Sequence, residues 1–281
     1  MIKKNMRIKQ SLEFAIKKIN ILDAEILLSY AIKKNKTFLY THPEYKLNNN
    51  QINKFKKYII KRSGGEPIAY IIKNKKFYNL DFFVNKNVLI PRPETEMLVE
   101  ETLKLVRDDK KIQSIIDIGT GSGCIIISLV KNIKNKNINF YATDISKKAL
   151  NISQKNAKKY KLNIKFIKSN LLKNINIYLK NYILIANLPY LKKNLNRSNL
   201  KFEPKKALYS GKDGLKLYNK LFLEIKNLKY KPKYVLLEFD CGQTEKIKKI
   251  IKNILPEYKI KIKKDLAGLN RILIAEKIAN Y

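Results

Sequence analysis

The sequence Asn187-Leu188-Pro189-Tyr190 directly follows an apolar run that ends at Ala186. An amide or exocyclic amino nitrogen is a weak nucleophile, because its lone pair is delocalised into the attached π-system. The Asn187 side-chain oxygen and the Leu188 backbone carbonyl would each accept one N–H hydrogen bond from such a nitrogen. They would orient it and stabilise the positive charge that develops as it attacks a carbon electrophile. No general base is then needed before the transfer.

The other two residues of this segment suit a planar substrate group. Pro189 would stiffen the turn, and Tyr190 would offer a flat face. An ordinary strand-to-loop turn is the structural alternative for an isolated Asn-x-Pro. We interpret the segment as the reacting site, with candidate catalytic residues Asn187, Leu188, Pro189 and Tyr190.

A second candidate site is rich in glycine. An apolar run at 114–118 leads into the sequence GTGSG at 119–123 and then into an apolar helical segment. Glycine allows the backbone to approach a ligand closely, because it has no Cβ to collide with it. Asp144 follows about 20 residues later, where nucleotide-binding sheets carry an acid that accepts hydrogen bonds from ribose. These features alone fit NAD, FAD or S-adenosylmethionine, and also a purely structural turn.

The spacing of the glycines distinguishes these cofactors. GxGxG with Asp117 two residues ahead of it resembles the first motif of Rossmann-like methyltransferases, whereas dehydrogenases carry GxGxxG. The resemblance implies S-adenosylmethionine as the cofactor, with Asp144 accepting two hydrogen bonds from its ribose.

The elements that would position these residues alternate between strand and helix. Strands separated by helical segments imply right-handed crossovers and a mostly parallel sheet. The pattern predicts an α/β, Rossmann-like, doubly wound, mostly parallel seven-stranded sheet with helices on both faces, the last strands antiparallel. Thr95 is expected to cap the first helix of this domain. The expected strands are 114–118, 139–143, 163–167, 182–186, 234–239, 258–263 and 271–276.

The N-terminal part has a different pattern. Apolar residues recur at helical spacing across residues 8–62, with Asp23 at an N-cap position, which predicts a small helical bundle. The break at residues 63–67 contains paired glycines and a proline. Aromatic and β-branched residues with Asn79 as a turn candidate then predict a β-hairpin. We expect a helical domain at 1–66, a hairpin connector at 67–90 and a cofactor domain at 91–281.

Composition limits the remaining possibilities. The net charge of +37 is compatible with nucleic-acid binding, but only six of the 60 basic residues are Arg and the lysines are spread along the whole chain, which favours compositional drift. The two cysteines, Cys124 and Cys241, lack metal or disulfide spacing, so we expect a reducing cytoplasm, no metal and a packing role for Cys124. Charges interrupt every apolar stretch, so we expect neither a signal peptide nor a membrane span.

Motifs throughout the chain narrow the chemistry further. NLPY at 187–190 resembles the (D/N)PPY signature of amino-methyltransferases, and an NLPY form also occurs in enzymes that dimethylate ribosomal RNA adenines. Outside it, the chain from about residue 20 resembles the family that methylates the glutamine of bacterial class 1 peptide chain release factors. The motifs that carry this resemblance are DAEILL at 23–28, GEPIAY at 65–70, LIPRPETE at 89–96, FEP at 202–204, DGL at 213–215 and LLE at 236–238.

This resemblance implies methylation of the glutamine side-chain amide in a Gly-Gly-Gln loop of the release factor, the helical domain binding that partner. Arg92 and Glu94 would bridge the hairpin and the site. We expect a monomer that forms no stable nucleic-acid complex. Departures from the family pattern at the site are Leu188 for a proline, and Asn170 and Leu171 where an acid and an aromatic are frequent; outside the site, Asn74 stands where a glycine is usual. The implied cofactor-binding residues are Gly119, Thr120, Gly121, Ser122, Gly123, Asp144, Leu171 and Asn187.

Three alternatives stay open on the sequence. The chain would act on a ribosomal-protein glutamine, on an RNA or DNA adenine N6, or as a binding module that has lost activity. The NLPY form and the net charge favour adenine methylation, and the departures at Leu188, Asn170 and Leu171 favour a module without activity.

Overall fold

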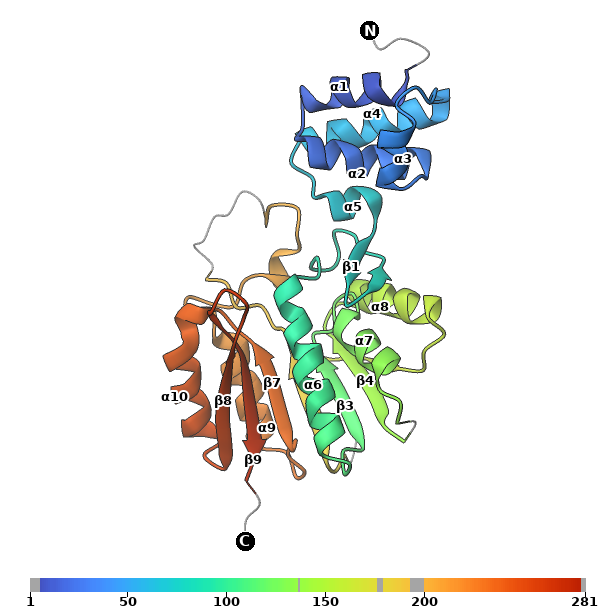
Figure 1. The fold of residues 1–281 in the computed structure, drawn as a ribbon. Coiled ribbons are helices and arrows are strands. Elements are labelled where there is room, and N and C mark those ends of the chain that lie inside the picture. Colours follow the sequence, from blue (N-terminus) through green and yellow to red (C-terminus); the bar gives the residue numbers. More distant parts are fainter. Residues whose placement is uncertain (1–5, 136, 176–178, 193–199, 279–281) are drawn as a thin grey trace. The chain divides into compact units, whose positions relative to one another are not determined.

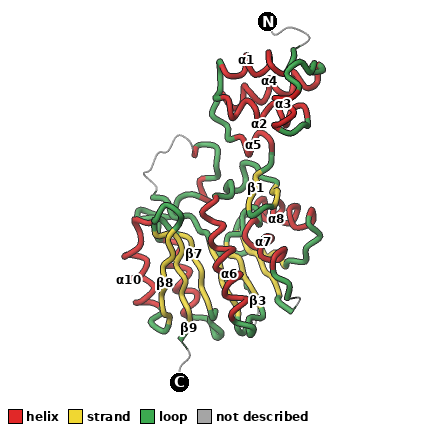
Figure 2. The backbone as a smooth tube through the Cα atoms, in the orientation of Figure 1, coloured by secondary structure: helices red, strands yellow, loops and turns green. Residues whose placement is uncertain are grey.

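The computed structural model describes residues 6–135, 137–175, 179–192 and 200–278. The chain forms two compact units, Met1–Asn74 and Lys75–Tyr281. The finer division of the chain at residues 66 and 90 stays a prediction. Figure 2 shows helices alone in the first unit and mixed strands and helices in the second.

The first unit is a helical bundle around one apolar core. Ile8, Leu27, Leu28 and Ile59 are almost fully buried in this core. Asn20 caps the second helix by accepting the Asp23 N–H at 2.8 Å, so the expectation that Asp23 is the N-cap was wrong. The helices are α1 (Ile8–Ile16), α2 (Ile21–Ile32), α3 (Lys36–Thr41), α4 (Asn49–Ser63) and α5 (Ile68–Ile72).

The hairpin is shorter than the sequence suggested. Strands β1 (Lys75–Phe77) and β2 (Leu80–Phe82) pair antiparallel, and Asn79 in their turn has a φ of 59°, as its turn role requires. Residues 68–72, expected to be part of the extended connector, are helical instead. Pro67 precedes this helix with a pre-set backbone, and Lys73 ends it in the left-handed region.

The second unit is built on one seven-stranded sheet, which confirms the predicted fold class. The strand order is β5-β4-β3-β6-β7-β9-β8, and only the pairs that involve β9 are antiparallel. The order reverses at β3, which lies between β4 and β6. Ligands bind at such a switch point, outside the carboxyl ends of the strands. The strands are β3 (Ser114–Ile118), β4 (Asn139–Asp144), β5 (Lys165–Lys168), β6 (Tyr182–Ala186), β7 (Tyr234–Glu238), β8 (Tyr258–Lys264) and β9 (Asn270–Lys277).

Helices cover both faces of this sheet. Figure 1 shows α6 in front of the strands and α9 behind them. Helix α6 contacts α7, which contacts α8, while α9 packs against α10. The apolar strands β3, β6 and β7 are buried along their whole length, as parallel strands between two helical layers must be. The longer helices are α6 (Glu96–Asp108), α7 (Cys124–Asn132), α8 (Lys147–Lys159), α9 (Lys216–Lys226) and α10 (Thr244–Ile254).

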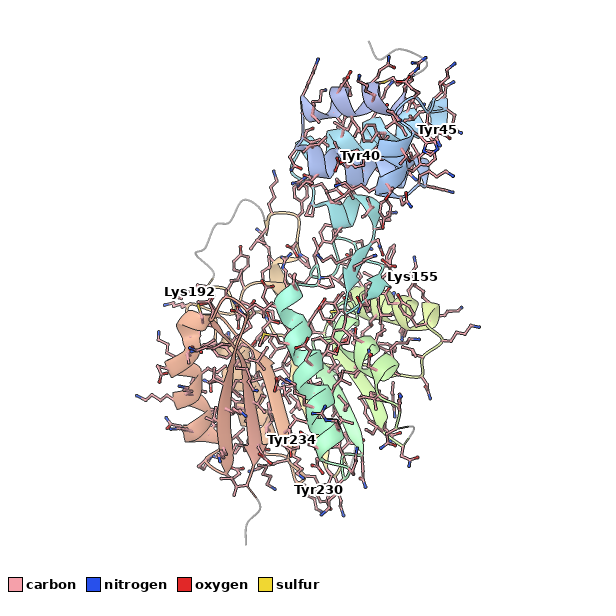
Figure 3. The ribbon with its side chains drawn as sticks, viewed as in Figure 1. Tyr40, Tyr45, Lys155, Lys192, Tyr230 and Tyr234 are labelled. Atoms are coloured by element: carbon pink, nitrogen blue, oxygen red, sulfur yellow. The ribbon has the colours of Figure 1, made fainter. Side chains whose placement is uncertain are left out.

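The side chains on the two faces follow the period-two alternation of the strands. Leu184 and Val235 belong to the cluster that contains Tyr218 and Phe222 of α9, whereas their neighbour Ile185 points to the opposite face. Figure 3 labels the exposed Lys155 of α8, whose Nζ lies 3.6 Å from the centroid of the Phe83 ring. No helix in the part of the chain that the structure describes is long and apolar enough to cross a membrane.

Candidate active site

A cavity of about 530 Å³ opens at the carboxyl ends of β3, β4 and β6, a volume typical of small-ligand sites. Among the residues predicted from the sequence, Gly123 and Tyr190 are not in its lining. Gly123 is the N-cap residue that precedes α7, and Tyr190 lies one residue beyond the lining segment 187–189. The predicted residues that do line it are Gly119, Thr120, Gly121, Ser122, Asp144, Leu171, Asn187, Leu188 and Pro189.

The glycine loop is held to the neighbouring strand by its backbone. The N–H groups of Gly119 and Thr120 both donate to the Thr143 carbonyl, at 2.9 and 2.8 Å. A Cβ on Gly119 would lie 3.1 Å from Leu188 Cδ2, and φ there is +74°. Glycine therefore lets the cofactor loop and the reacting segment pack directly against each other.

Two acids lie beside this loop. Asp117 is fully buried and accepts the Thr120 hydroxyl at 2.6 Å, and burial raises its pKa to about 7. Asp144 accepts the Gly121 N–H at 3.0 Å on one oxygen and the Ser146 N–H at 2.8 Å on the other. Each Asp144 oxygen keeps a further lone pair, so a ligand diol at the cavity would find two acceptors.

Leu171 and Cys124 complete the apolar wall of the cavity. Leu171 has a φ of +55°, and the Ser169 hydroxyl donates to its carbonyl at 2.8 Å. Cys124 is 8% exposed, and burial raises its pKa to about 12. The thiol is therefore protonated at neutral pH, in agreement with the packing role expected for it.

The Asn187 side chain lies at the edge of the cavity with its amide nitrogen turned inward to the protein. Its Nδ2 donates to Thr95 Oγ1 at 3.0 Å and to Glu238 Oε2 at 2.8 Å. These contacts use both amide hydrogens. The side-chain oxygen is then the atom of Asn187 available to a ligand.

The segment after Asn187 is braced by three buried polar groups. The Tyr218 hydroxyl lies 3.2 Å from the Leu188 carbonyl and also contacts the Glu238 carbonyl. A hydroxyl has one proton, and a carbonyl has two lone pairs, so the Leu188 carbonyl can accept a further hydrogen bond. The Tyr190 hydroxyl donates to Glu238 Oε1 at 3.2 Å, and Gln243 Nε2 donates to the Tyr190 carbonyl at 2.9 Å.

Thr95 does not have the role that the sequence suggested. It precedes α6, but its side chain makes no capping hydrogen bond and its hydroxyl donates to Glu238 Oε2 at 2.6 Å. The expected cap was therefore wrong: Thr95 has a helical backbone (φ −66°, ψ −19°) in place of the extended one of an N-cap, and its side-chain oxygen accepts from Asn187 Nδ2.

Arg92 and Glu94 were predicted to bridge the hairpin and the site, and of these two residues Arg92 alone is in the cavity lining. Arg92 lines the cavity and forms an ion pair with Glu203, which also accepts the Ile90 N–H at 3.0 Å. Glu94 is in the single-turn helix η1 (Pro93–Thr95) and is not in the lining. The ion pair between Arg92 and Glu203 therefore connects the segment before α6 to the loop that contains Pro204, which lines the same cavity.

Six residues that hold this site together had no site role in the prediction from the sequence. Asn156 of α8 donates to the carbonyls of Ser122 and Phe83 at 2.8 and 3.0 Å and so braces the glycine loop. Glu238 could have been found from the sequence, because it is a charged residue at the end of the otherwise apolar strand β7. These six residues are Thr95, Asn156, Glu203, Tyr218, Glu238 and Gln243.

Comparisons with known proteins agree with this geometry. Residues 7–72 match the PrmC N-terminal domain, and residues 94–203 match the methyltransferase small domain. Release factor glutamine methyltransferase from Coxiella burnetii is 36% identical over 268 residues, covering 91% of each chain. The protein of the same name from Bacillus cereus is 34% identical over 260 residues, covering 90% of this chain and 91% of its own length.

Solved structures resemble the fold. The hMettl16 catalytic domain, in complex with the MAT2A 3'UTR hairpin 6, has a TM-score of 0.58 at 16% identity, covering 90% of this chain and 93% of that one. At this identity the likeness extends to the fold alone. Sequence identity above 30% over nine-tenths of the chain places it more narrowly: this protein belongs to the release factor glutamine methyltransferase family, whose members are S-adenosylmethionine-dependent enzymes.

Proposed function

We propose that this protein methylates the side-chain amide nitrogen of the glutamine in the Gly-Gly-Gln motif of class 1 peptide chain release factors. Its family supports the substrate. The observation that carries the chemistry is the orientation of the Asn187 amide, whose two N–H groups are used by Thr95 and Glu238. The oxygen left at the cavity edge is the acceptor that a planar N–H donor needs.

The cavity suits S-adenosylmethionine, which supplies an electrophilic methyl group when bound. Asp144 would accept hydrogen bonds from ribose with the two lone pairs left on its carboxylate. The loop from Gly119 to Gly123 would lie against the polar part of the cofactor, and Leu171 would pack on its adenine.

Asn187 Oδ1 and the Leu188 carbonyl would each accept one N–H of the substrate amide. Two such bonds would aim the nitrogen lone pair and hold the growing positive charge, which is where a preorganised acceptor contributes most. Pro189 keeps the two acceptors in a rigid turn. Tyr190 would provide the flat wall beside the amide, and it would have to meet the substrate just outside the present cavity lining.

The remaining parts of the proposal concern the partner and the setting. The helical unit would bind the release factor. The enzyme would act as a monomer in the cytoplasm, with no membrane association and no stable nucleic-acid complex. The lysine excess is spread over the chain rather than gathered in one motif, which supports that last point.

The test uses purified protein, labelled S-adenosylmethionine and a purified class 1 release factor. We expect label on the Gly-Gly-Gln peptide, a mass increase of one methylene on glutamine, and no transfer when that glutamine is replaced by alanine. Bulk RNA is the second acceptor in the same assay. Label on RNA with none on the release factor would reject the proposal in favour of adenine methylation.

A further inference from the structure

Glu238 is a carboxylate buried at the carboxyl end of β7, with 1% of its surface exposed. Parallel pairing of Ala186 with Leu237 places the following residues, Asn187 and Glu238, beside each other at the edge of the sheet. The carboxylate accepts hydrogen bonds from Thr95, Asn187 and Tyr190.

The partners of this carboxylate are unusual for a structural acid. Burying an ionised group is costly, so buried acids are normally paired with a cation. Here the described contacts of Glu238 are hydroxyl and amide donors, two of them from the segment that would bind the substrate. Burial raises the pKa of Glu238, and the hydrogen bonds from Thr95 and Tyr190 together with the charge of Arg271 oppose that rise, although Arg271 forms its ion pair with Asp265.

We propose that Glu238 is a positioning residue that sets which way the Asn187 amide faces, with Thr95 as its helper. The two orientations of a carboxamide have nearly the same shape, so only hydrogen bonding selects between them. A carboxylate accepts and cannot donate, so it requires the amide nitrogen of Asn187 on its own side. This inference rests on the proposed function, because it matters only if Asn187 Oδ1 receives a substrate N–H.

Thr95 makes the selection complete. Its hydroxyl donates to Glu238 and so presents a lone pair to the second amide hydrogen of Asn187. Both amide hydrogens of Asn187 are therefore held. If the amide flipped, its oxygen would face the oxygens of Glu238 and Thr95, and no hydrogen would lie between them. In the flipped state, the amide N–H groups of Asn187 would also meet the N–H groups of the substrate.

The main test compares Glu238→Leu with Glu238→Gln. Leucine removes both acceptor oxygens. Glutamine keeps one oxygen, which can hold Thr95 and Asn187, while its NH₂ can donate to the Tyr190 hydroxyl. We expect kcat per cofactor-binding site to fall about 100-fold for Glu238→Leu, the scale seen when one preorganised group at a reacting centre is lost. Glu238→Gln should stay within about tenfold of wild type by the same reasoning, and the KM for release factor should change little in either.

A control variant removes another glutamate of the same sheet that accepts a tyrosine hydroxyl, although this glutamate is exposed and Glu238 is buried. Glu276 of β9 accepts the Tyr234 hydroxyl at 3.1 Å, and Tyr234, labelled in Figure 3, begins β7 and so lies at the opposite end of that strand from Glu238. Glu276→Leu should leave kcat and KM unchanged. If Glu238→Leu folds, binds cofactor and keeps kcat within threefold of Glu276→Leu, the inference is wrong.

A second pair of variants covers the case in which Glu238→Leu does not fold. Thr95→Val removes the hydroxyl at nearly constant volume, and Thr95→Ser keeps it. We expect valine to lower kcat about tenfold relative to serine, and equal values would overturn the inference.

A spectroscopic readout separates this inference from the proposed function. The Asn187 side-chain N–H signals, assigned by their absence in Asn187→Asp, should be protected from hydrogen exchange in the wild type and in Glu276→Leu, and unprotected in Glu238→Leu or Thr95→Val. This measurement needs no substrate. Protection with no methylation of release factor would reject the proposed function alone, whereas exchange as fast in the wild type as in the variants would reject the positioning role.

Discussion

Gly214 lies directly against the backbone of the reacting segment, so adding a single methyl group there should damage both stability and turnover. Its φ is +82°, and a Cβ would lie 2.0 Å from the Tyr190 carbonyl oxygen and 2.5 Å from Gln243 Nε2. Since real Cβ contacts are not shorter than 3.0 Å, the Tyr190 carbonyl must move by about 1 Å in Gly214→Ala.

The expected cost has two parts. An alanine in the left-handed region costs about 1–2 kcal/mol. Displacing the Tyr190 carbonyl also breaks the hydrogen bond from Gln243, and leaving buried polar groups unpaired costs about 1–3 kcal/mol. Gly214→Ala should therefore lower the free energy of unfolding by roughly 2–5 kcal/mol. A shift of about 1 Å next to the reacting group should lower kcat about 100-fold.

Gly268 provides the control for backbone strain alone. Its φ is +77°, and a Cβ there would meet nothing within 4 Å. Gly268→Ala should lose only the first part of the cost, about 1–2 kcal/mol, and keep wild-type kcat. Urea unfolding and methyl transfer to release factor measure the two quantities. If both variants lose the same unfolding free energy and Gly214→Ala keeps normal turnover, the close approach of Gly214 to Tyr190 adds nothing to the cost of the substitution.

Three further predictions concern the cofactor loop. Asp144→Ala should weaken S-adenosylmethionine binding at least tenfold in calorimetry, because two ribose acceptors are lost; wild-type affinity would remove the assignment. The pKa of Asp117 is raised from 3.8 to about 7, so the folded state keeps a proton that the unfolded state loses, and wild-type stability should fall as pH rises through that window. Asp117→Asn should remove up to about 1.4 kcal/mol of this fall per pH unit. Urea unfolding of both proteins at several pH values measures it, and parallel plots of unfolding free energy against pH would contradict the prediction. With an alkylating reagent at about pH 8, Cys241 should react in the folded protein and Cys124 only after denaturation, because the pKa of Cys124 is about 12; peptide masses will show which thiol is modified.

Local patterns in the sequence were enough to predict the cofactor domain. Apolar strands, helical spacing and glycine-rich turns depend on neighbouring residues, so their order along the chain defines a doubly wound sheet. That fold then places the carboxyl ends of β3, β4 and β6 together. Gly119, Asp144 and Asn187, each at one of those ends, are found around one cavity.

Capping and connector predictions were less successful, because several local outcomes compete. Asp23 and Thr95 both have residue types that cap helices. Asn20 takes the first role with an extended backbone three residues earlier, whereas Thr95 has a helical backbone and its hydroxyl donates to the buried Glu238. The apolar segment 68–72 carries no periodicity long enough to separate a strand from one turn of helix.

The amino-acid sequence by itself determined which chemical groups this protein brings to its site: a glycine loop, an acid placed to bind ribose, and an asparagine two residues before a proline. Only the tertiary structure decided which way that asparagine faces. The register between β6 and β7 brings Glu238 beside Asn187 across 51 positions of sequence, and Thr95 reaches it across 92. The physical reason is that strand pairing fixes neighbours without regard to their separation along the chain, and no local pattern records that pairing.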